Sequence, residues 1–158
     1  MTNLSDDVGN LPHRLFKMNA RLSEARSTLR EVVKEYSYQK GVYPSQERVR
    51  QFEDFASNFA AAANEVRAFC PEDPDGIADK LSADALDFAR NSKTLASMIP
   101  GYSWQPGAVY GAGWDRCLDA PISHVTAAHQ LVIERLVEDA RRTAAMTGTM
   151  LTLQAVSR

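Results

Sequence analysis

Apolar residues recur at alternating intervals of three and four positions along the chain, and this spacing predicts helices. Over residues 12–38, Leu15, Leu22 and Leu29 stand seven residues apart, and further apolar residues lie between them. The average interval of 3.5 residues is typical of helices that pack along a coiled-coil-like seam. The segment therefore predicts a first helix about 40 Å long, at a rise of 1.5 Å per residue.

The same spacing predicts three further helices, over residues 46–69, 74–98 and 121–146. The second has a wider apolar stripe than the first, because Phe55 and Ala62 flank its seam, and a wide stripe suits a helix with two neighbours. The expected seam positions are Val49, Phe52, Ala56, Phe59, Ala63, Val66 and Cys70 in the second helix, Ile77, Leu81, Ala85, Phe88, Ser92, Leu95 and Ile99 in the third, and Ile122, Val125, His129, Val132, Leu136 and Ala140 in the fourth.

Local signals set the expected helix ends. Ser45 is a good N-cap for the second helix, since its hydroxyl can accept from a free backbone N–H. Asp73 can cap the third helix and Pro74 can occupy its first turn, as Pro121 can in the fourth. Gly148 is expected to interrupt the fourth helix, which leaves the role of residues 147–158 open between helix, apolar strap and contact with another subunit.

These elements predict an all-α protein, with four long antiparallel-type amphipathic helices in a bundle. We expect one domain over residues 11–158, preceded by a polar, flexible leader at 1–10. Short connections make the first three helices antiparallel neighbours. The stretch at 99–120 is long enough for the fourth helix to run in either direction.

The stretch at 99–120 has no helical period and is rich in aromatic residues and glycine. It holds both tryptophans and four of the eight glycines of the chain. Long irregular loops are often functional, and large aromatic side chains carry much of the energy of protein interfaces. We expect a protein-binding surface, aromatic residues that close one end of the bundle, or a small-ligand pocket. The candidate binding residues are Tyr102, Trp104, Tyr110, Trp114 and Arg116.

Charge is distributed unevenly along the chain, whose net charge is −2. Residues 11–40 hold seven Lys or Arg against three Glu, whereas residues 51–100 hold nine Asp or Glu against four Lys or Arg. The simpler interpretation is complementarity between neighbouring helices. The alternative is a basic face for an acidic partner, in which Arg14 and Arg21 flank the seam while Lys17 and Arg30 point elsewhere. The net charge argues against a dedicated nucleic-acid binder.

The sequence lacks the signatures of a membrane span, an export signal, a di-metal site and a dinucleotide-binding site. No apolar run approaches the roughly 20 residues of a membrane span, and no export signal is evident, so we expect a cytoplasmic protein with Cys70 and Cys117 as free thiols. No Glu precedes a histidine by three positions, as a di-metal bundle requires. The Gly111-Ala112-Gly113 sequence lacks the third glycine of a dinucleotide site. We therefore expect no cofactor and no metal.

The sequence favours a non-enzymatic protein-interaction module, such as an adaptor, a chaperone-like protein or an inhibitor of bacterial or phage type. Its partner would be another protein, bound by the aromatic loop and by the basic face with Arg14 and Arg21. The seam also permits self-association as a homodimer. The alternative is a small-ligand-binding or enzymatic bundle, in which the loop covers a pocket near His129 and His124 or Cys117 takes part.

Overall fold

The computed structural model confirms an all-α fold. It describes residues 10–36, 44–99 and 114–157, with side chains over 10–31, 44–99 and 114–148. All regular structure in these ranges is helical. The helices are α2 (Leu11–Tyr36), α3 (Gln46–Phe69), α4 (Ile77–Ser97) and α5 (Asp119–Ser157), and a single 3-10 turn, η1 (Arg116–Leu118), directly precedes α5.

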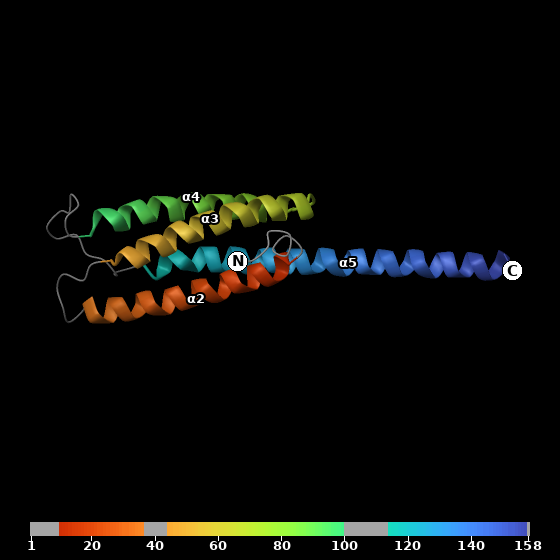
Figure 1. Cartoon of the computed structure of the whole chain (residues 1–158), viewed down its shortest axis with the longest axis horizontal. Coiled ribbons are helices and arrows are strands. Elements are labelled where there is room, and N and C mark those ends of the chain that lie inside the picture. Colours follow the sequence, from red (N-terminus) through yellow and green to blue (C-terminus); the bar gives the residue numbers. More distant parts are fainter. Residues whose placement is uncertain (1–9, 37–43, 100–113, 158) are drawn as a thin grey trace.

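The four helices form an up-and-down bundle (Figure 1). Each helix runs antiparallel to the one before it in the chain, so α5 runs antiparallel to both α4 and α2. This settles the direction of the last helix, which the sequence left open. The closest packing joins α3 to α4, and α2 packs along α5, whereas α2 and α3 approach each other at few points. The bundle is therefore two helix pairs with one loosely closed edge between α2 and α3.

Most of the described seam residues that the sequence predicts in the first three helices lie in the core, although Ala56 and Ile99 are only half-buried. Leu118, Val125, Ala128 and Val132 complete the core from η1 and α5. Leu15, Phe59 and Val132 are fully buried, and Phe88 is 2% exposed. Phe88 anchors the aromatic centre of the core, with ring centroids 5.2 Å from Phe55 and 5.1 Å from Phe59. Burying aromatic side chains of this size contributes the largest individual apolar terms to stability. The predicted periodicity is thus confirmed where helices face one another.

The turn between α3 and α4 differs in detail from the expectation. Asp73 accepts hydrogen bonds from the backbone N–H groups of Ile77 and Ala78, both at 2.9 Å, so its capping role is confirmed. Pro74 lies in the turn and not in the first turn of the helix. The reason is Gly76, whose φ of +63° turns the chain just before Ile77 and lets the carboxylate of Asp73 reach over it. Ser45 caps α3 as predicted.

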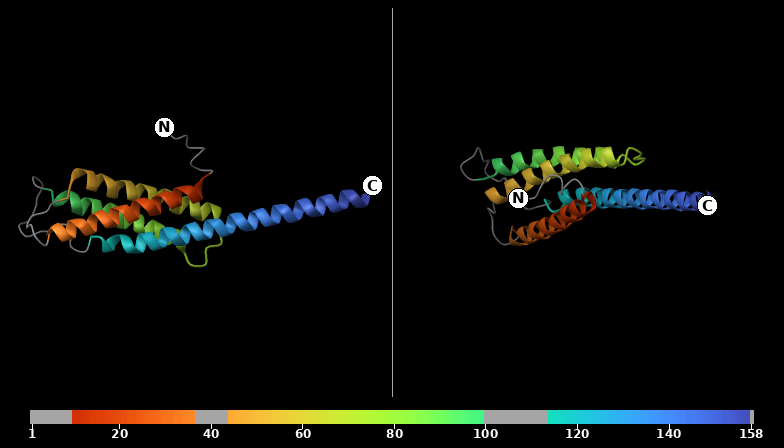
Figure 2. Two further views of the ribbon diagram at one scale, coloured as in Figure 1. Left: turned by 90° about the horizontal axis from the view of Figure 1, so that it is seen from below. Right: turned by 45° about the vertical axis from the view of Figure 1, so that its right-hand side comes forward.

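The last helix is longer at both ends than the predicted 121–146. It begins at Asp119, so Pro121 sits in its first turn, where a missing N–H costs nothing. It runs through Gly148, and the expected interruption there is wrong. Its 39 residues extend well past the ends of the other helices (Figures 1 and 2). Ala144, Ala145, Met146, Met150 and Leu151 are strong helix formers, which offsets the roughly 1 kcal/mol that one glycine costs, although Thr147 and Thr149 beside it are weaker helix formers.

The buried face of α5 also differs from its predicted seam. Leu118 of η1 and Pro121, Val125, Ala128 and Val132 of α5 are buried, again at intervals of three and four. Val125 and Val132 are predicted seam positions and are confirmed. Of the predicted seam, Ile122 and His129 are only half-buried, and Leu136 and Ala140 are exposed. Leu136 lies level with the start of α2 and the end of α3, where it lines a depression with Leu11 and Phe69. From there α5 continues beyond the other helices (Figure 1).

Candidate functional site

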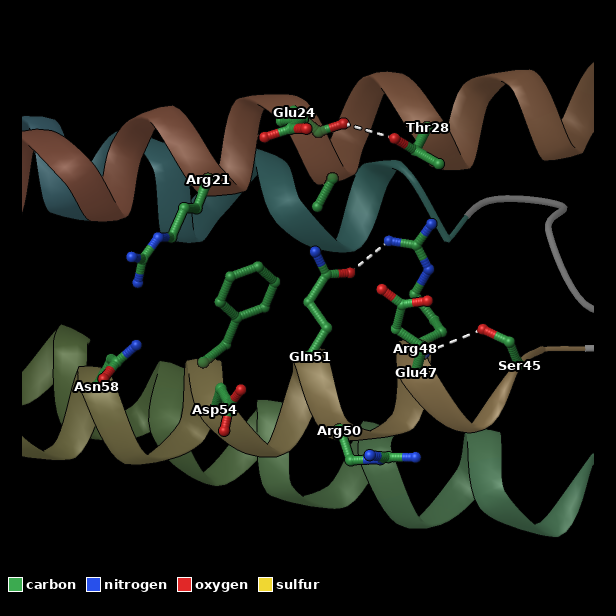
Figure 3. Close-up of a pocket in the computed structure, with 12 residues that line it drawn as sticks. Arg21, Glu24, Thr28, Ser45, Glu47, Arg48, Arg50, Gln51, Asp54 and Asn58 are labelled. Atoms are coloured by element: carbon green, nitrogen blue, oxygen red, sulfur yellow. Dashed lines mark hydrogen bonds between the residues drawn. The ribbon is translucent and has the colours of Figure 1, made fainter.

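The loosely closed edge of the bundle forms a groove between α2 and α3. We call it the α2/α3 groove (Figure 3). It has two adjoining depressions, of about 690 Å³ and about 250 Å³, which share Arg21 and Asn58. Arg21 reaches from α2 toward α3, and Gln51 reaches from α3 toward α2. Buried side chains of Ala25 and Phe55 contribute to the lining of the larger depression, so the groove combines polar walls with apolar surface.

The two depressions differ in charge. The larger one has balanced charge, from the basic residues Arg21, Arg48 and Arg50 and the acidic residues Glu24, Glu47 and Asp54. The smaller one is lined by Arg14, Lys17 and Arg21 from α2 and by a single acidic residue, Glu65 from α3. Because Glu65 forms an ion pair with Arg14, it does not neutralise the other two cations.

Lys17 and Arg21 are the cations of the smaller depression that have no acidic partner among the described residues. Within the part of the chain that the structure describes, neither makes a hydrogen bond or an ion pair, and both are exposed. The sequence placed Arg14 and Arg21 beside the seam, which agrees with their position here. It placed Lys17 on another face, and that was wrong: residues 14, 17 and 21 lie three and four positions apart and share one helix surface.

Other basic residues of α2 form ion pairs with neighbouring elements on the surface of the bundle. Arg26 pairs with Asp119 at 3.2 Å, and Arg30 pairs with Asp115 at 3.2 Å. These contacts join the middle of α2 to the start of α5 and to the residue before η1. Part of the positive charge of α2 is therefore neutralised by neighbouring elements of the bundle. Lys17 and Arg21 have no such partner among the described residues.

The predicted aromatic loop is described only at its end. Tyr102, Trp104 and Tyr110 lie outside the described residues. Trp114 is half-buried, and its ring centroid lies 6.2 Å from that of Phe52, at 67°. Arg116 is exposed in η1, at the end of the bundle where α5 begins, whereas Arg14 lies near the opposite end (Figure 1). The candidate binding residues that the structure describes thus form two groups, with Arg14 and Arg21 in the α2/α3 groove and Trp114 and Arg116 beside the start of α5. Trp114 packs against the core.

A buried carboxylate that sequence reasoning missed pairs α4 with α5. Asp84 is 5% exposed, and its Oδ2 lies 2.6 Å from Nδ1 of His124. Burial raises the pKa of the Asp84 carboxyl above its usual 3.8, and the hydrogen bond from His124 opposes part of this rise. An aspartate within an otherwise apolar face, three residues after Leu81 and four before Phe88, is the signal that could have found it.

The thiols are poorly suited to nucleophilic chemistry. Cys70 and Cys117 are both free and lie at opposite ends of the bundle (Figure 1). Burial raises the pKa of Cys117 to about 11, and nearby Asp115 and Asp119 contribute to this rise. Burial also raises the pKa of Cys70. Because the thiolate is the nucleophile, these environments disfavour reaction at neutral pH.

The described residues contain neither a cluster of metal ligands nor a membrane-spanning helix. Among the described residues, no group of three or more His, Cys, Asp or Glu side chains is placed to hold a metal ion. Within the described residues, no helix has the length and apolarity that crossing a bilayer requires. His129 is half-buried on α5 and does not line the α2/α3 groove.

Comparisons with known proteins give no assignment. No protein-family model matches the chain, and neither a curated protein nor a solved structure matches it.

Proposed function

We propose that this chain is a protein-interaction module whose α2/α3 groove binds an acidic segment of a partner protein. The observation that carries the proposal is the pair of unpartnered cations, Lys17 and Arg21, beside a groove with apolar surface in its lining. A partner carboxylate would gain a charge-assisted hydrogen bond from either residue. The apolar surface would contribute the burial that makes such contacts stable.

The dimensions of the groove suit a helix or an extended peptide. On α2 it is lined from Leu11 to Thr28, which corresponds to about 25 Å at 1.5 Å per residue. Amphipathic helices bind in grooves of this kind through apolar residues at one face, and charges at the edge set their orientation. The balanced charge near Arg48 and Asp54 suits polar residues, so the acidic residues of the partner would lie near Lys17 and Arg21.

Charge reversal tests the proposal. Tagged wild-type chain and the Lys17→Glu/Arg21→Glu variant are compared in capture experiments with a lysate of the source organism, followed by mass spectrometry. We expect the wild type to retain an acidic partner that elutes as the salt concentration rises, and we expect the variant to lose it.

The matched control is Lys80→Glu/Lys93→Glu, which reverses two exposed charges on α4. It should retain the partner as the wild type does. Equal capture by all three chains, or no specific capture by the wild type, would contradict the proposal. Circular dichroism of each variant verifies that the bundle is folded.

A further inference from the structure

The outer part of α5, residues 136–157, extends beyond the other helices of the bundle (Figures 1 and 2). Its composition is nevertheless that of a helix whose surface is covered by another chain. From Leu136 to Gly148 every side chain except the half-buried Asp139 is exposed, and Met146 is 66% exposed. Residues 143–157 contain no Asp, Glu, Lys or Arg. Helices that remain in water normally present charged residues, so a helix of 15 uncharged residues indicates a surface that another chain covers.

An apolar groove lies where α5 leaves the bundle. Its volume is about 590 Å³, and it is lined mainly by apolar side chains. Leu136 is 41% exposed at its edge, at the foot of the outer part of α5. We call this depression the basal groove. Its apolar lining is Leu11, Pro12, Ala68, Phe69, Val132 and Leu136, and Asn10 and Glu65 complete the lining. An uncharged helix and an apolar groove are complementary, but one chain cannot join them, because the helix points away from its own groove (Figure 1).

The order of charges along α5 indicates what covers it. An acidic group, Glu138 and Asp139, is followed directly by Arg141 and Arg142, and Glu134 and Arg135 together carry no net charge one turn earlier. Two parallel copies would place like charges side by side. Two antiparallel copies place the acidic group of each beside the arginines of the other, which is favourable. The pairs already present within one helix, such as Arg142 to Glu138 at 3.2 Å, would then extend into a network across the two helices.

We propose that two copies of this chain pair antiparallel through the outer part of α5. Charge matching sets the centre of the pair near Ala140, so that Glu138 of one copy faces Arg142 of the other. Ala144 then lies opposite Leu136 of the second copy, and Gly148 lies level with Val132, whose side chain is buried in its own bundle. The uncharged end of each helix thereby reaches the basal groove of the other copy. The basal groove adjoins the smaller depression of the α2/α3 groove, with which it shares Leu11 and Glu65. The two proposals are nevertheless tested by different variants, because the changes on the outer part of α5 leave Lys17 and Arg21 in place.

The oligomeric mass of the full chain tests the pairing. Sedimentation equilibrium of the wild type at tens of micromolar should give twice the chain mass of 17.5 kDa. The Ala144→Glu/Met146→Glu variant, changed only outside the bundle, should give the mass of a single chain with unchanged helicity. Leu86→Glu, at a leucine 68% exposed on α4, is the matched control and should remain a dimer. A monomeric wild type, or a dimer unaffected by the two glutamates, would overturn the proposal.

Disulfide trapping tests the direction. Chains carrying Leu136→Cys and Ala144→Cys are oxidised separately and as a mixture, with the wild type as the control for its own thiols. Antiparallel pairing predicts a disulfide-linked dimer mainly in the mixture. A parallel pair would link each variant to itself, because identical positions then lie opposite each other, and that result would refute the arrangement. Binding of a monomeric wild type to neutral phosphatidylcholine vesicles would likewise show that the helix is covered by lipid and not by a second copy.

Discussion

At the scale of single residues, the pairing of Asp84 with His124 is the feature that the sequence least revealed. The partners are 40 positions apart, and only the packing of α4 on α5 brings them together. A buried carboxylate is costly unless it is hydrogen-bonded, so the pair restricts how these two helices can slide or rotate against each other. Sequence periodicity identifies the buried face of each helix but not the register between them, and for that reason the contact was not predicted.

The pH dependence of stability should reveal the burial of Asp84. Because its pKa is raised in the folded protein, ionisation of this carboxyl costs free energy in the native state. The contribution of the protonated Asp84 carboxyl to the free energy of unfolding is complete below the usual pKa of 3.8. This contribution is lost as the pH rises through the raised pKa of the folded protein. Urea unfolding of the wild type and of Asp84→Asn at a series of pH values should therefore show the wild type losing stability relative to the variant as the pH rises from below 3.8. A difference that is constant with pH, or that changes in the opposite direction, would contradict this account.

At the scale of helices, the sequence predicted α3 fully and α5 only in part. The bounds of α3 follow from Ser45 before it and from Pro71 shortly after it, and both act locally. The end of α5 has no such signal. Gly148 alone does not stop a helix that has good helix formers one turn before it and in the turn after it. The seam positions Leu136 and Ala140 do not show where the other helices end.

Two glycines provide a matched test of these helix ends. Open space surrounds the Cβ position of both Gly76 and Gly148, but only Gly76 has a positive φ, of +63°. Gly148→Ala should stabilise the outer part of α5 locally by about 0.5–1 kcal/mol, because alanine is the better helix former. Gly76→Ala should destabilise the protein by about 1–2 kcal/mol, because the left-handed conformation is strained for alanine.

Amide hydrogen exchange and urea unfolding measure the two effects. Exchange over residues 141–148 should slow in Gly148→Ala while the global unfolding midpoint changes little, since these residues pack on no other helix of the same chain. Gly76→Ala should lower the midpoint. If alanine at position 148 speeds exchange there, the continuous helix is incorrect.

At the scale of the whole molecule, the sequence predicted four packed helices but not the edge that stays open. Each apolar stripe indicates that a helix is buried, and none indicates which neighbour covers it. The ion pairs of Arg26 and Arg30 join α2 to the start of α5, which leaves the opposite side of α2 only loosely closed by α3. Of the candidate site, Arg14 and Arg21 were predicted from spacing, and the groove between them and α3 required the tertiary structure.

The most direct test of the central claim is photo-crosslinking from inside the α2/α3 groove. A photoreactive amino acid replaces Asn58, which lines both depressions, and in a control chain it replaces Ala83, which is exposed on α4. After irradiation in the source organism, crosslinked peptides are identified by mass spectrometry. The account predicts a defined acidic segment of one protein crosslinked from position 58 and absent from position 83. Crosslinks of equal pattern from both positions, or none from position 58, would contradict it.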